Sequence, residues 1–546
     1  MDMKEMKILI GGAWPYANGS LHIGHLAGLL PADIIARYHR LKGDDVYFVS
    51  DSDCYGTPVA IRAKTENRTP KEISNGYHRE FCDCFEKLGF SFDRYGKTTD
   101  ETHISFVQDF HKKLYQSPYV TERTVPQAYC ETCGTWLADR FVHGICPDCG
   151  NEARGDQCDA CGRVLESESL IDPVCSLCDN TPVFRESTRL FIEISKLEKE
   201  LRDFINSHPE WRKNAIAFGN RYIDEGLRDR AITRDLSWGI DVPKTGYEDK
   251  KIYIWAENVL GYLSQSYAVC QERGTDFQKL WGPDARHYYV HGKDNIPFHI
   301  IILPALLLAN GSGYHLPDEI ISSEYLTLEG NKISTSRNYA IWLKDIVGRY
   351  HPDSLRYYLT ASGPEKRDAD FSWEEFYHHH NSELLGGYGN FINRNLSFVQ
   401  KYFDGCIPDG TPDEYLTAKT EDIFASTGSR IERGALKEAL GEIFELVRYG
   451  NKYFDTNKPW ETRNSDIPSC QNTIFNCIQL IANLAVLLSP ILPFSSQTVC
   501  QWLDLKPRWE RQTIKGGTHL PPTGILFERL DKKIIEEERS RLPAKE

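Results

Sequence analysis

Two histidines near the N-terminus, His22 and His25, have the spacing and the setting of a phosphate-binding site. They follow an apolar run, residues 8–10, and a loop rich in glycine, proline and asparagine. They also open an apolar segment of helical periodicity that reaches about residue 41. The pattern predicts a buried parallel strand, a tight loop and the N-terminus of a helix.

The N-terminus of a helix presents unpaired backbone N–H groups and the positive end of the helix dipole, and both favour bound phosphate. Imidazoles three residues apart lie on one face of the first turn, so both can reach the same polyphosphate. Gly24 between them leaves room for a flat base to approach the backbone. The H-x-x-H spacing alone, however, also fits an ordinary strand-to-helix turn with two surface histidines.

Eight of the 16 cysteines form four C-x2-C pairs between residues 130 and 178. The N-terminus lacks a secretory leader pattern, and in a chain without an export signal such pairs indicate metal ligands rather than disulfides. Glycine follows three of the four pairs, as the turn of a zinc knuckle requires.

Eight thiolates make two tetrahedral sites of four sulfur ligands, which leave no open position and are therefore expected to be structural zinc sites. The short link between the second and third pairs predicts that the inner four cysteines share one ion and the outer four share the other. The inner ligands are Cys146, Cys149, Cys158 and Cys161, and the outer ligands are Cys130, Cys133, Cys175 and Cys178.

Other polar groups stand at strand ends and in loops. Asp53 follows a second apolar run, which predicts a strand, and ligand-binding residues collect beyond the carboxyl ends of such strands. The position of Asp53 before Pro58 also fits a cap of the following helix. Lys332 lies in a loop of glycine, serine and threonine, which can bring an ammonium to a phosphoryl group. Lys293–Asp294 also fits a solvated turn, and His299 also fits a hydrogen-bonded core histidine.

The length and charge of the chain limit its class. With 546 residues it is long enough for three or four domains, and its net charge of −14 argues against a general nucleic-acid binder. An RNA partner would need a local basic surface and specific base contacts. There is no run of 18 apolar residues, so we expect no membrane span and a cytoplasmic protein.

The overall pattern predicts an α/β protein with an all-helical C-terminal part. Apolar strands alternate with helical segments up to about residue 117, and residues 127–178 form the cysteine-rich stretch. Residues 185–249 are typical of helices, and a second α/β stretch begins at residue 252. From about residue 381 to the end, the segments have helical periodicity.

Six strings, in this order along the chain, carry a resemblance to one family: PYANGSLHIGH, ITRDLSWGI, HGKDNIPFH, KISTSRNYAIW, DSLRYYLT and NKPW. With them the chain resembles, from end to end, the methionyl-tRNA synthetases of class I, in their four-knuckle form. The resemblance implies a class I Rossmann domain split by a zinc-binding connective insert, a KMSKS-loop domain and an α-helical anticodon-binding bundle. The implied boundaries are 1–117 and 250–321 for the halves of the Rossmann domain, 118–249 for the insert, 322–384 for the KMSKS-loop domain and 385–546 for the bundle.

The resemblance also implies a role for each matching residue. His22, His25 and Lys332 would be catalytic and would stabilise the phosphates of ATP while methionine is converted to its adenylate. The implied ATP-binding residues are Asn18, Gly24, Lys293, Asp294 and Thr335. The implied amino-acid pocket consists of Ala13, Trp14, Tyr16, Asp53, Trp255, Asn258, Tyr262 and His299, with Asp53 on the amino group. The implied readers of a CAU anticodon are Asn390, Arg394 and Trp460. Mg²⁺ would accompany ATP, and we expect a monomer.

The chain departs from the family pattern chiefly around the amino acid, although Thr335 also stands where the second lysine of the KMSKS loop is usual. The residues that differ from the usual ones are Trp14 for leucine, Tyr55 for histidine, Asn258 for alanine, Val259 where one form of the family pattern has proline, and Leu303 where tryptophan is frequent. One hypothesis is a repacked pocket that still selects methionine. The alternatives are a paralogue that activates another amino acid or resists an inhibitor, and a catalytically silent tRNA-binding protein.

Overall fold

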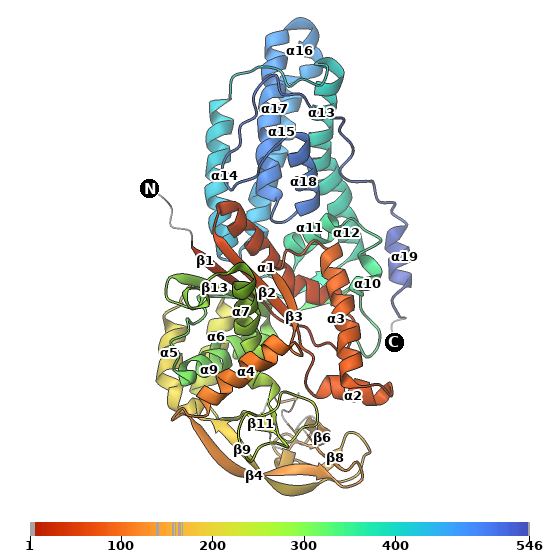
Figure 1. The fold of residues 1–546 in the computed structure, drawn as a ribbon. Helices are drawn as coiled ribbons and strands as arrows, with labels where there is room; N and C mark the ends of the chain where they lie inside the picture. Colours follow the sequence, from red (N-terminus) through yellow and green to blue (C-terminus); the bar gives the residue numbers. More distant parts are fainter. Residues whose placement is uncertain are drawn as a thin grey trace.

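A five-stranded parallel sheet lies at the centre of the chain (Figure 1). The computed structural model describes residues 6–137, 141–155, 158, 160–161, 165 and 167–543. The strand order is β14-β13-β1-β2-β3, and each pair of neighbours is parallel. The strands are β1 (Lys7–Gly12), β2 (Asp45–Ser52), β3 (Arg94–Lys97), β13 (Ala285–Gly292) and β14 (Glu319–Ser323). The buried parallel strand predicted over residues 8–10 is confirmed as the central strand β1.

Alternate residues of β1 enter two hydrophobic cores on opposite faces of the sheet. Ile8 and Ile10 belong to one core and Leu9 belongs to the other, and all three side chains are fully buried. A parallel strand covered on both faces is expected to be apolar in this continuous way. The first face is covered by α1 (Ile23–Lys42) and α3 (Pro70–Lys87), and the second by α4 (Glu101–Leu114), α7 (Gly261–Arg273) and α9 (Leu303–Asn310).

Between β3 and β13 the chain forms a separate lobe, at the bottom of Figure 1. Its frame is a long antiparallel ribbon of β4 (Val120–Cys130) and β9 (Val183–Ile192). The shorter strands of the lobe are β5 (Thr135–Trp136), β6 (Val142–Ile145), β7 (Glu152–Arg154), β8 (Ile171–Cys175) and β10 (Arg230–Ala231). Two helices, α5 (Glu198–Asn206) and α6 (Lys213–Asp224), connect the lobe back towards the sheet.

The helical character predicted for residues 185–249 is wrong for residues 185–192, which belong to β9, and for residues 225–249, which consist of short strands, turns and loops. The first residues of β9 are exposed, so this end of the ribbon has no buried face and its sequence lacks the alternation that marks a half-buried strand. Pairing with β4 determines the extended conformation here. Helices α5 and α6 follow within the predicted range, and then short strands β11 (Thr233–Arg234) and β12 (Lys251–Ile252) lead to the second α/β part.

The C-terminal part is a helical bundle that stands above the sheet in Figure 1. Its helices are α13 (Asn390–Tyr402), α14 (Glu414–Glu432), α15 (Leu436–Asn457), α16 (Pro459–Ser465), α17 (Ile467–Leu488) and α18 (Pro493–Trp502), with α19 (Ile534–Ser540) near the end of the chain. By length and composition α17 could cross a membrane, but 83% of its most apolar window is buried inside the protein. It is the core helix of this bundle.

The prediction of helices from residue 381 to the end is wrong for residues 503–533, which run over the bundle without helical structure. Hydrogen bonds to the side chains of neighbouring helices hold this segment, such as those that Asn483 of α17 makes with the backbone of Gln512. Because these partners are distant in sequence, the local pattern could not reveal the extended path.

A fully buried ion pair joins helix α1 to the C-terminal part. Arg356 lies on α11 (Pro352–Ser362) and donates to Asp33 of α1 at 2.6 Å and to the carbonyl of Ile491 at 2.8 Å. Burial alone would raise the pKa of Asp33, but Arg356, Arg37 and Ser91 lower it to about 2. The carboxylate is therefore ionised at neutral pH and fixes α1 against the bundle.

Candidate active site

The two histidines predicted to bind phosphate form the N-terminal cap of α1. The Nδ1 atom of His22 accepts a hydrogen bond from the backbone N–H of Gly24 at 3.1 Å, and Nδ1 of His25 accepts from the backbone N–H of His22 at 3.0 Å. The ring centroids lie 3.8 Å apart. Because each Nδ1 is an acceptor, each neutral ring carries its proton on Nε2, which remains a donor.

Burial determines the charge of both imidazoles. It lowers the pKa of His22 to about 4, and burial together with the neighbouring His22 lowers the pKa of His25 well below its usual value. At neutral pH the protein therefore holds two uncharged N–H donors side by side. Such donors stabilise negative charge that develops on a phosphate.

One large cavity brings these histidines together with the polar loop of the second half of the chain. The loop connects β16 (Asn331–Lys332) to α10 (Leu343–Ile346), and the backbone N–H of Ile23 bonds the carbonyl of Ile341 at 2.9 Å. The space not filled by atoms is about 1190 Å³. The lining residues are Tyr16, Asn18, Gly19, Ser20, His22, His25, Arg62, Tyr77, Thr335, Ser336, Asn338, Trp342 and Lys344.

The predicted lysine of this loop lies just outside the cavity lining. Lys332 is exposed on β16, whereas its neighbour Ile333 approaches Gly24, where an added methyl group would lie 3.6 Å from the Ile333 side chain. The residues of the loop that do line the cavity are Thr335, Ser336, Asn338 and Trp342. The cavity also has two cations, Arg62 and Lys344, that the sequence patterns did not single out.

Lys293 and Asp294 follow the carboxyl end of β13, in the turn Lys293–Asn295. The ammonium of Lys293 pairs with Glu324 at 2.7 Å and with Asp368 at 2.8 Å, and Asp294 accepts a hydrogen bond from the hydroxyl of Tyr325. The turn is close to α1, since a methyl group added to Gly28 would lie 3.9 Å from the backbone nitrogen of Gly292.

A second, smaller cavity contains all eight residues predicted for the amino-acid pocket. About 370 Å³ of it is not filled by atoms, and its walls are mainly aromatic. Trp14 packs on Tyr262 with ring centroids 4.0 Å apart, and Trp255 stacks on Phe298 at 4.0 Å. The lining residues are Ala13, Trp14, Tyr16, Asp53, Trp255, Asn258, Val259, Tyr262, Asn295, Phe298 and His299.

Hydrogen bonds fix the polar side of this aromatic pocket. Nδ1 of His299 donates to the carbonyl of Asn295 at 2.8 Å, so Nε2 accepts from the hydroxyl of Tyr262 at 2.7 Å. Burial lowers the pKa of His299 to about 4, which keeps the ring neutral. Opposite, the buried carboxylate of Asp53 accepts from the amide Nδ2 of Asn258 at 3.2 Å.

The departures from the family pattern divide into two groups. Trp14 and Asn258 line the pocket, and Trp14 fits there because Gly261 has no side chain: an added methyl group would lie 3.0 Å from the indole. Tyr55 packs against Trp238 at 5.0 Å, and Leu303 is fully buried in the core behind the pocket. The described lining of the pocket includes neither of the last two.

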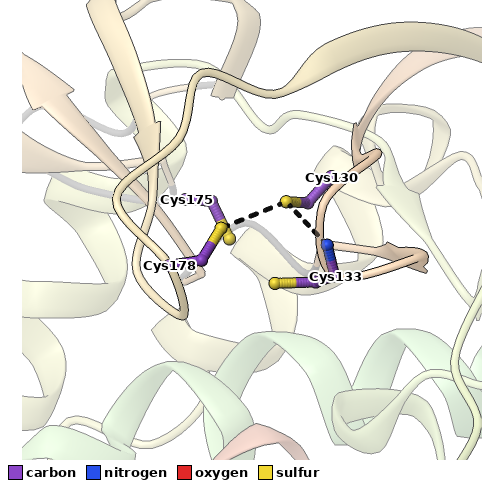
Figure 2. Close-up of side chains that lie close together, drawn as sticks. All are labelled: Cys130, Cys133, Cys175 and Cys178. Atoms are coloured by element: carbon purple, nitrogen blue, oxygen red, sulfur yellow. Dashed lines mark hydrogen bonds between the residues drawn. The ribbon is translucent and has the colours of Figure 1, made fainter.

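The eight paired cysteines form two clusters, as the sequence predicted. Cys130, Cys133, Cys175 and Cys178 meet in one cluster (Figure 2), and Cys146, Cys149, Cys158 and Cys161 meet in the other. In each, the sulfur atoms lie within 4.8 Å of one another, and the closest pairs are 3.4 to 3.9 Å apart. A tetrahedron with zinc–sulfur bonds of about 2.3 Å has edges of about 3.8 Å, so both clusters are consistent with zinc sites.

Hydrogen bonds to sulfur shape the turns around these clusters. The backbone N–H of Cys133 donates to Cys130 at 3.4 Å, and the side-chain amides of Asn151 and Asn180 approach Cys149 and Cys178 at 3.4 and 3.5 Å. After the fourth pair, where the chain has no glycine, Asp179 adopts the left-handed φ of +58° instead. Aspartate tolerates this conformation better than most residues, so the knuckle turn is preserved.

The three residues predicted to read an anticodon lie on two helices of the bundle. Asn390 and Arg394 are one turn apart at the start of α13, and Trp460 lies in α16, at the top of Figure 1. The guanidinium of Arg394 lies 4.0 Å from the ring centroid of Phe454, and Trp460 packs on that ring at 5.7 Å with 40% of its surface exposed. An exposed tryptophan beside a cation is a surface on which an unpaired base can stack.

Comparison with known families gives two matches that together span most of the chain. The family described as tRNA synthetases class I (M) matches residues 8–396, and the anticodon binding domain of methionyl tRNA ligase matches residues 407–545.

Individual relatives agree with these matches. The chain is 51% identical over 540 residues to methionine–tRNA ligase 1 of Alkaliphilus oremlandii (strain OhILAs), covering 98% of this chain and 100% of that protein. It is 50% identical over 546 residues to methionine–tRNA ligase of Bacillus cereus (strain 03BB102), covering 98% and 99%.

The same fold occurs in the crystal structure of Mycobacterium tuberculosis methionyl-tRNA synthetase bound by methionyl-adenylate. The TM-score is 0.79 at 22% sequence identity, over 96% of this chain and 100% of that one. At this identity the likeness establishes the α/β fold, while the identity to the ligases above establishes the family. The chain therefore belongs to the methionyl-tRNA synthetases, the class I aminoacyl-tRNA synthetases that act as methionine–tRNA ligases.

Proposed function

We propose that this methionine–tRNA ligase forms methionyl-adenylate where its two cavities meet and then transfers methionine to tRNA. The observation that carries the proposal is that Tyr16 lines both cavities. An amino acid held in the aromatic pocket then has its carboxylate next to a nucleotide held in the larger cavity. Adjacent binding of this kind supplies much of the rate, since neither step needs a strong protein base.

In the first step the carboxylate of methionine attacks the α-phosphorus of ATP and pyrophosphate leaves. Negative charge moves onto the departing phosphates, and the Nε2–H groups of His22 and His25 stabilise it. Lys332 and Thr335 approach the same phosphates when their loop closes. Asn18, Gly24, Lys293 and Asp294 hold the nucleotide, and Mg²⁺ brought with ATP would neutralise part of its charge.

The aromatic pocket selects the amino acid. Asp53 binds the α-ammonium, and the thioether lies against Trp14, Trp255 and Tyr262, because sulfur makes favourable contacts with aromatic rings. Ala13, Tyr16, Asn258 and His299 complete the pocket. The pairing of His299 with Tyr262 leaves neither group as an unpaired polar atom beside an apolar side chain.

In the second step the terminal adenosine hydroxyl of tRNA attacks the carbonyl carbon of the adenylate; the anhydride bond breaks, AMP leaves with the hydroxyl proton transferred to its phosphate or to water, and the methionyl ester of tRNA is formed. Asn390, Arg394 and Trp460 bind the CAU anticodon at the helical bundle. The guanidinium of Arg394, which also pairs with Asp455 at 2.6 Å, and the exposed ring of Trp460 provide a local base-binding surface on a chain of negative net charge. We propose a monomer that acts in the cytoplasm.

We further propose that each cysteine cluster holds one structural Zn²⁺, which supplies folding free energy to a lobe with a small core. Each predicted domain would then have one role. Residues 1–117 and 250–321 would carry out adenylation, and residues 118–249 would hold the zinc sites. Residues 322–384 would contain the closing loop, and residues 385–546 would bind the anticodon.

The function is tested by ATP–pyrophosphate exchange with all twenty standard amino acids, followed by charging of tRNA that bears a CAU anticodon. We expect methionine to support exchange and charging. Exchange with a different amino acid would overturn the methionine assignment while leaving the enzyme class in place. Tight binding of CAU tRNA with no exchange would instead indicate a catalytically silent tRNA-binding protein.

His22→Asn separates the catalytic role of His22 from its capping role. Asparagine still caps the helix through its side-chain oxygen but lacks the Nε2–H donor, so we expect the exchange kcat to fall about 10²- to 10³-fold. The matched control is His351→Asn, because Nδ1 of His351 caps α11 in the same way outside this cavity. Equal activity of the two variants would contradict the proposed role.

The zinc proposal predicts the metal content of the purified protein. We expect two zinc ions per chain in the wild type and one in Cys146→Ser, in which one ligand of the inner cluster is lost. Cys406→Ser is the control, since Cys406 is exposed and belongs to neither cluster. Elemental analysis measures all three, and iron, or a content unaffected by Cys146→Ser, would reject the proposal.

Trp460→Ala tests the anticodon surface. Loss of one stacking platform is worth about 1–3 kcal/mol, so we expect KM for tRNA to rise about 5- to 150-fold while exchange without tRNA is unchanged. Tyr415→Ala, which removes a 60% exposed aromatic ring of α14, should change neither quantity. A wild-type KM in Trp460→Ala would show that this surface does not contact tRNA.

A further inference from the structure

Asp53 is a buried carboxylate in an unusually acidic setting. It is 2% exposed, and the fully buried carboxyl groups of Asp51 and Glu257 lie in the same region of the core. Glu257 is paired with His103 at 2.9 Å, and Asp51 accepts from the amide of Gln265 at 2.8 Å, so both of these acids have partners of their own. No ion pair between described residues joins Asp53 to a lysine, an arginine or a histidine.

The side chain that donates to Asp53 is Asn258. Its amide Nδ2 lies 3.2 Å from Oδ2 of Asp53, and both residues line the aromatic pocket. In the described part of the chain, Oδ1 of Asp53 and Oδ1 of Asn258 are buried and have no hydrogen-bond partner. Two adjacent buried acceptors without donors are costly, and a ligand with several N–H groups would satisfy both.

The environment opposes ionisation of Asp53. Burial raises its pKa most strongly, the charge of Glu257 raises the pKa further, and the hydrogen bonds from Asn258 and from the backbone of Tyr55 lower it. The other ionisable side chains around this carboxylate and across the pocket include Tyr16, Asp51, Cys54, Tyr55, His103, Tyr262 and His299. Asn258 is thus the side chain that favours the charged form.

We infer that Asn258 is a positioning residue that orients the Asp53 carboxylate through its Nδ2–H group and offers Oδ1 as a second acceptor to the α-ammonium of the substrate. This inference rests on the proposed role of Asp53 and deepens it. The resemblance to the family implies alanine at position 258, so this chain departs from the usual pattern here. It accounts for a polar group in a pocket that otherwise selects an apolar side chain.

The test is the pH dependence of kcat/KM for methionine in ATP–pyrophosphate exchange, compared between wild type and Asn258→Ala. Activity requires ionised Asp53 and is lost as the pH falls through its pKa. Without the Asn258 hydrogen bond the pKa of Asp53 rises. We therefore expect the acid limb of the pH profile, where kcat/KM falls as the pH is lowered, to move to higher pH by about one unit. We also expect KM for methionine to rise about 10- to 100-fold, while KM for ATP stays within about two-fold.

Substrate analogues and a neighbouring variant separate this role from simple packing. Selectivity for methionine over its α-hydroxy analogue should fall in Asn258→Ala, whereas selectivity over ethionine, which differs only in the side chain, should not change. The matched control is Val259→Ala, which alters an adjacent lining residue and should leave the acid limb in place. Asn258→Ser retains a donor and should partly restore the wild-type limb.

An unchanged acid limb in Asn258→Ala, or a change only in selectivity over ethionine, would overturn the inference. Failure of the underlying assignment has a different signature. If Asp53→Asn kept a normal KM for methionine, Asp53 itself would not bind the ammonium, whatever the behaviour of Asn258.

Discussion

The candidate active site depends on two hydrogen bonds between imidazole Nδ1 atoms and the backbone at the start of α1. They satisfy N–H groups that a helix terminus leaves unpaired, and they determine which ring nitrogen keeps its proton. The rings cannot turn without exposing those N–H groups, so the donors are oriented before any substrate arrives. Burial keeps both rings neutral, which avoids repulsion between them in the absence of phosphate.

These donors are useful only if α1 is itself held in place. Its inner face packs on the parallel sheet, and its buried Asp33 is bound to Arg356, which also holds the carbonyl groups of Pro490 and Ile491. Removing one partner of such a pair leaves an uncompensated buried charge, at a cost of about 3–5 kcal/mol. The orientation of α1 is therefore shared between the catalytic sheet and the helical bundle.

Much of this architecture could be predicted because its signals are local. An apolar run predicted strand β1, and the glycine-rich loop before His22 predicted the N-terminus of a helix. The spacing of the C-x2-C pairs predicted both cysteine clusters. The pocket residues were predicted as a set through the resemblance, and they do line one cavity. Their individual roles, and that of Lys332, stay predictions.

What could not be predicted depends on partners distant in sequence. Lys293 pairs with Glu324 and Asp368 through tertiary contacts, and Leu303 lies behind the pocket rather than in it. The exposed half of β9 is extended only because β4 lies beside it. The contact of Asn258 with Asp53 joins residues 205 positions apart and is visible only in the folded chain.

The two cysteine clusters are nested along the chain, and this arrangement implies an order of assembly. Cys149 and Cys158 are 9 positions apart in the inner cluster, whereas Cys130 and Cys178 span 48 positions in the outer one. Closing the shorter link first costs about 1.5 kcal/mol less chain entropy than closing the longer one directly. Once the inner cluster has formed, it shortens the effective path between the outer cysteines, so formation of the inner cluster favours formation of the outer one.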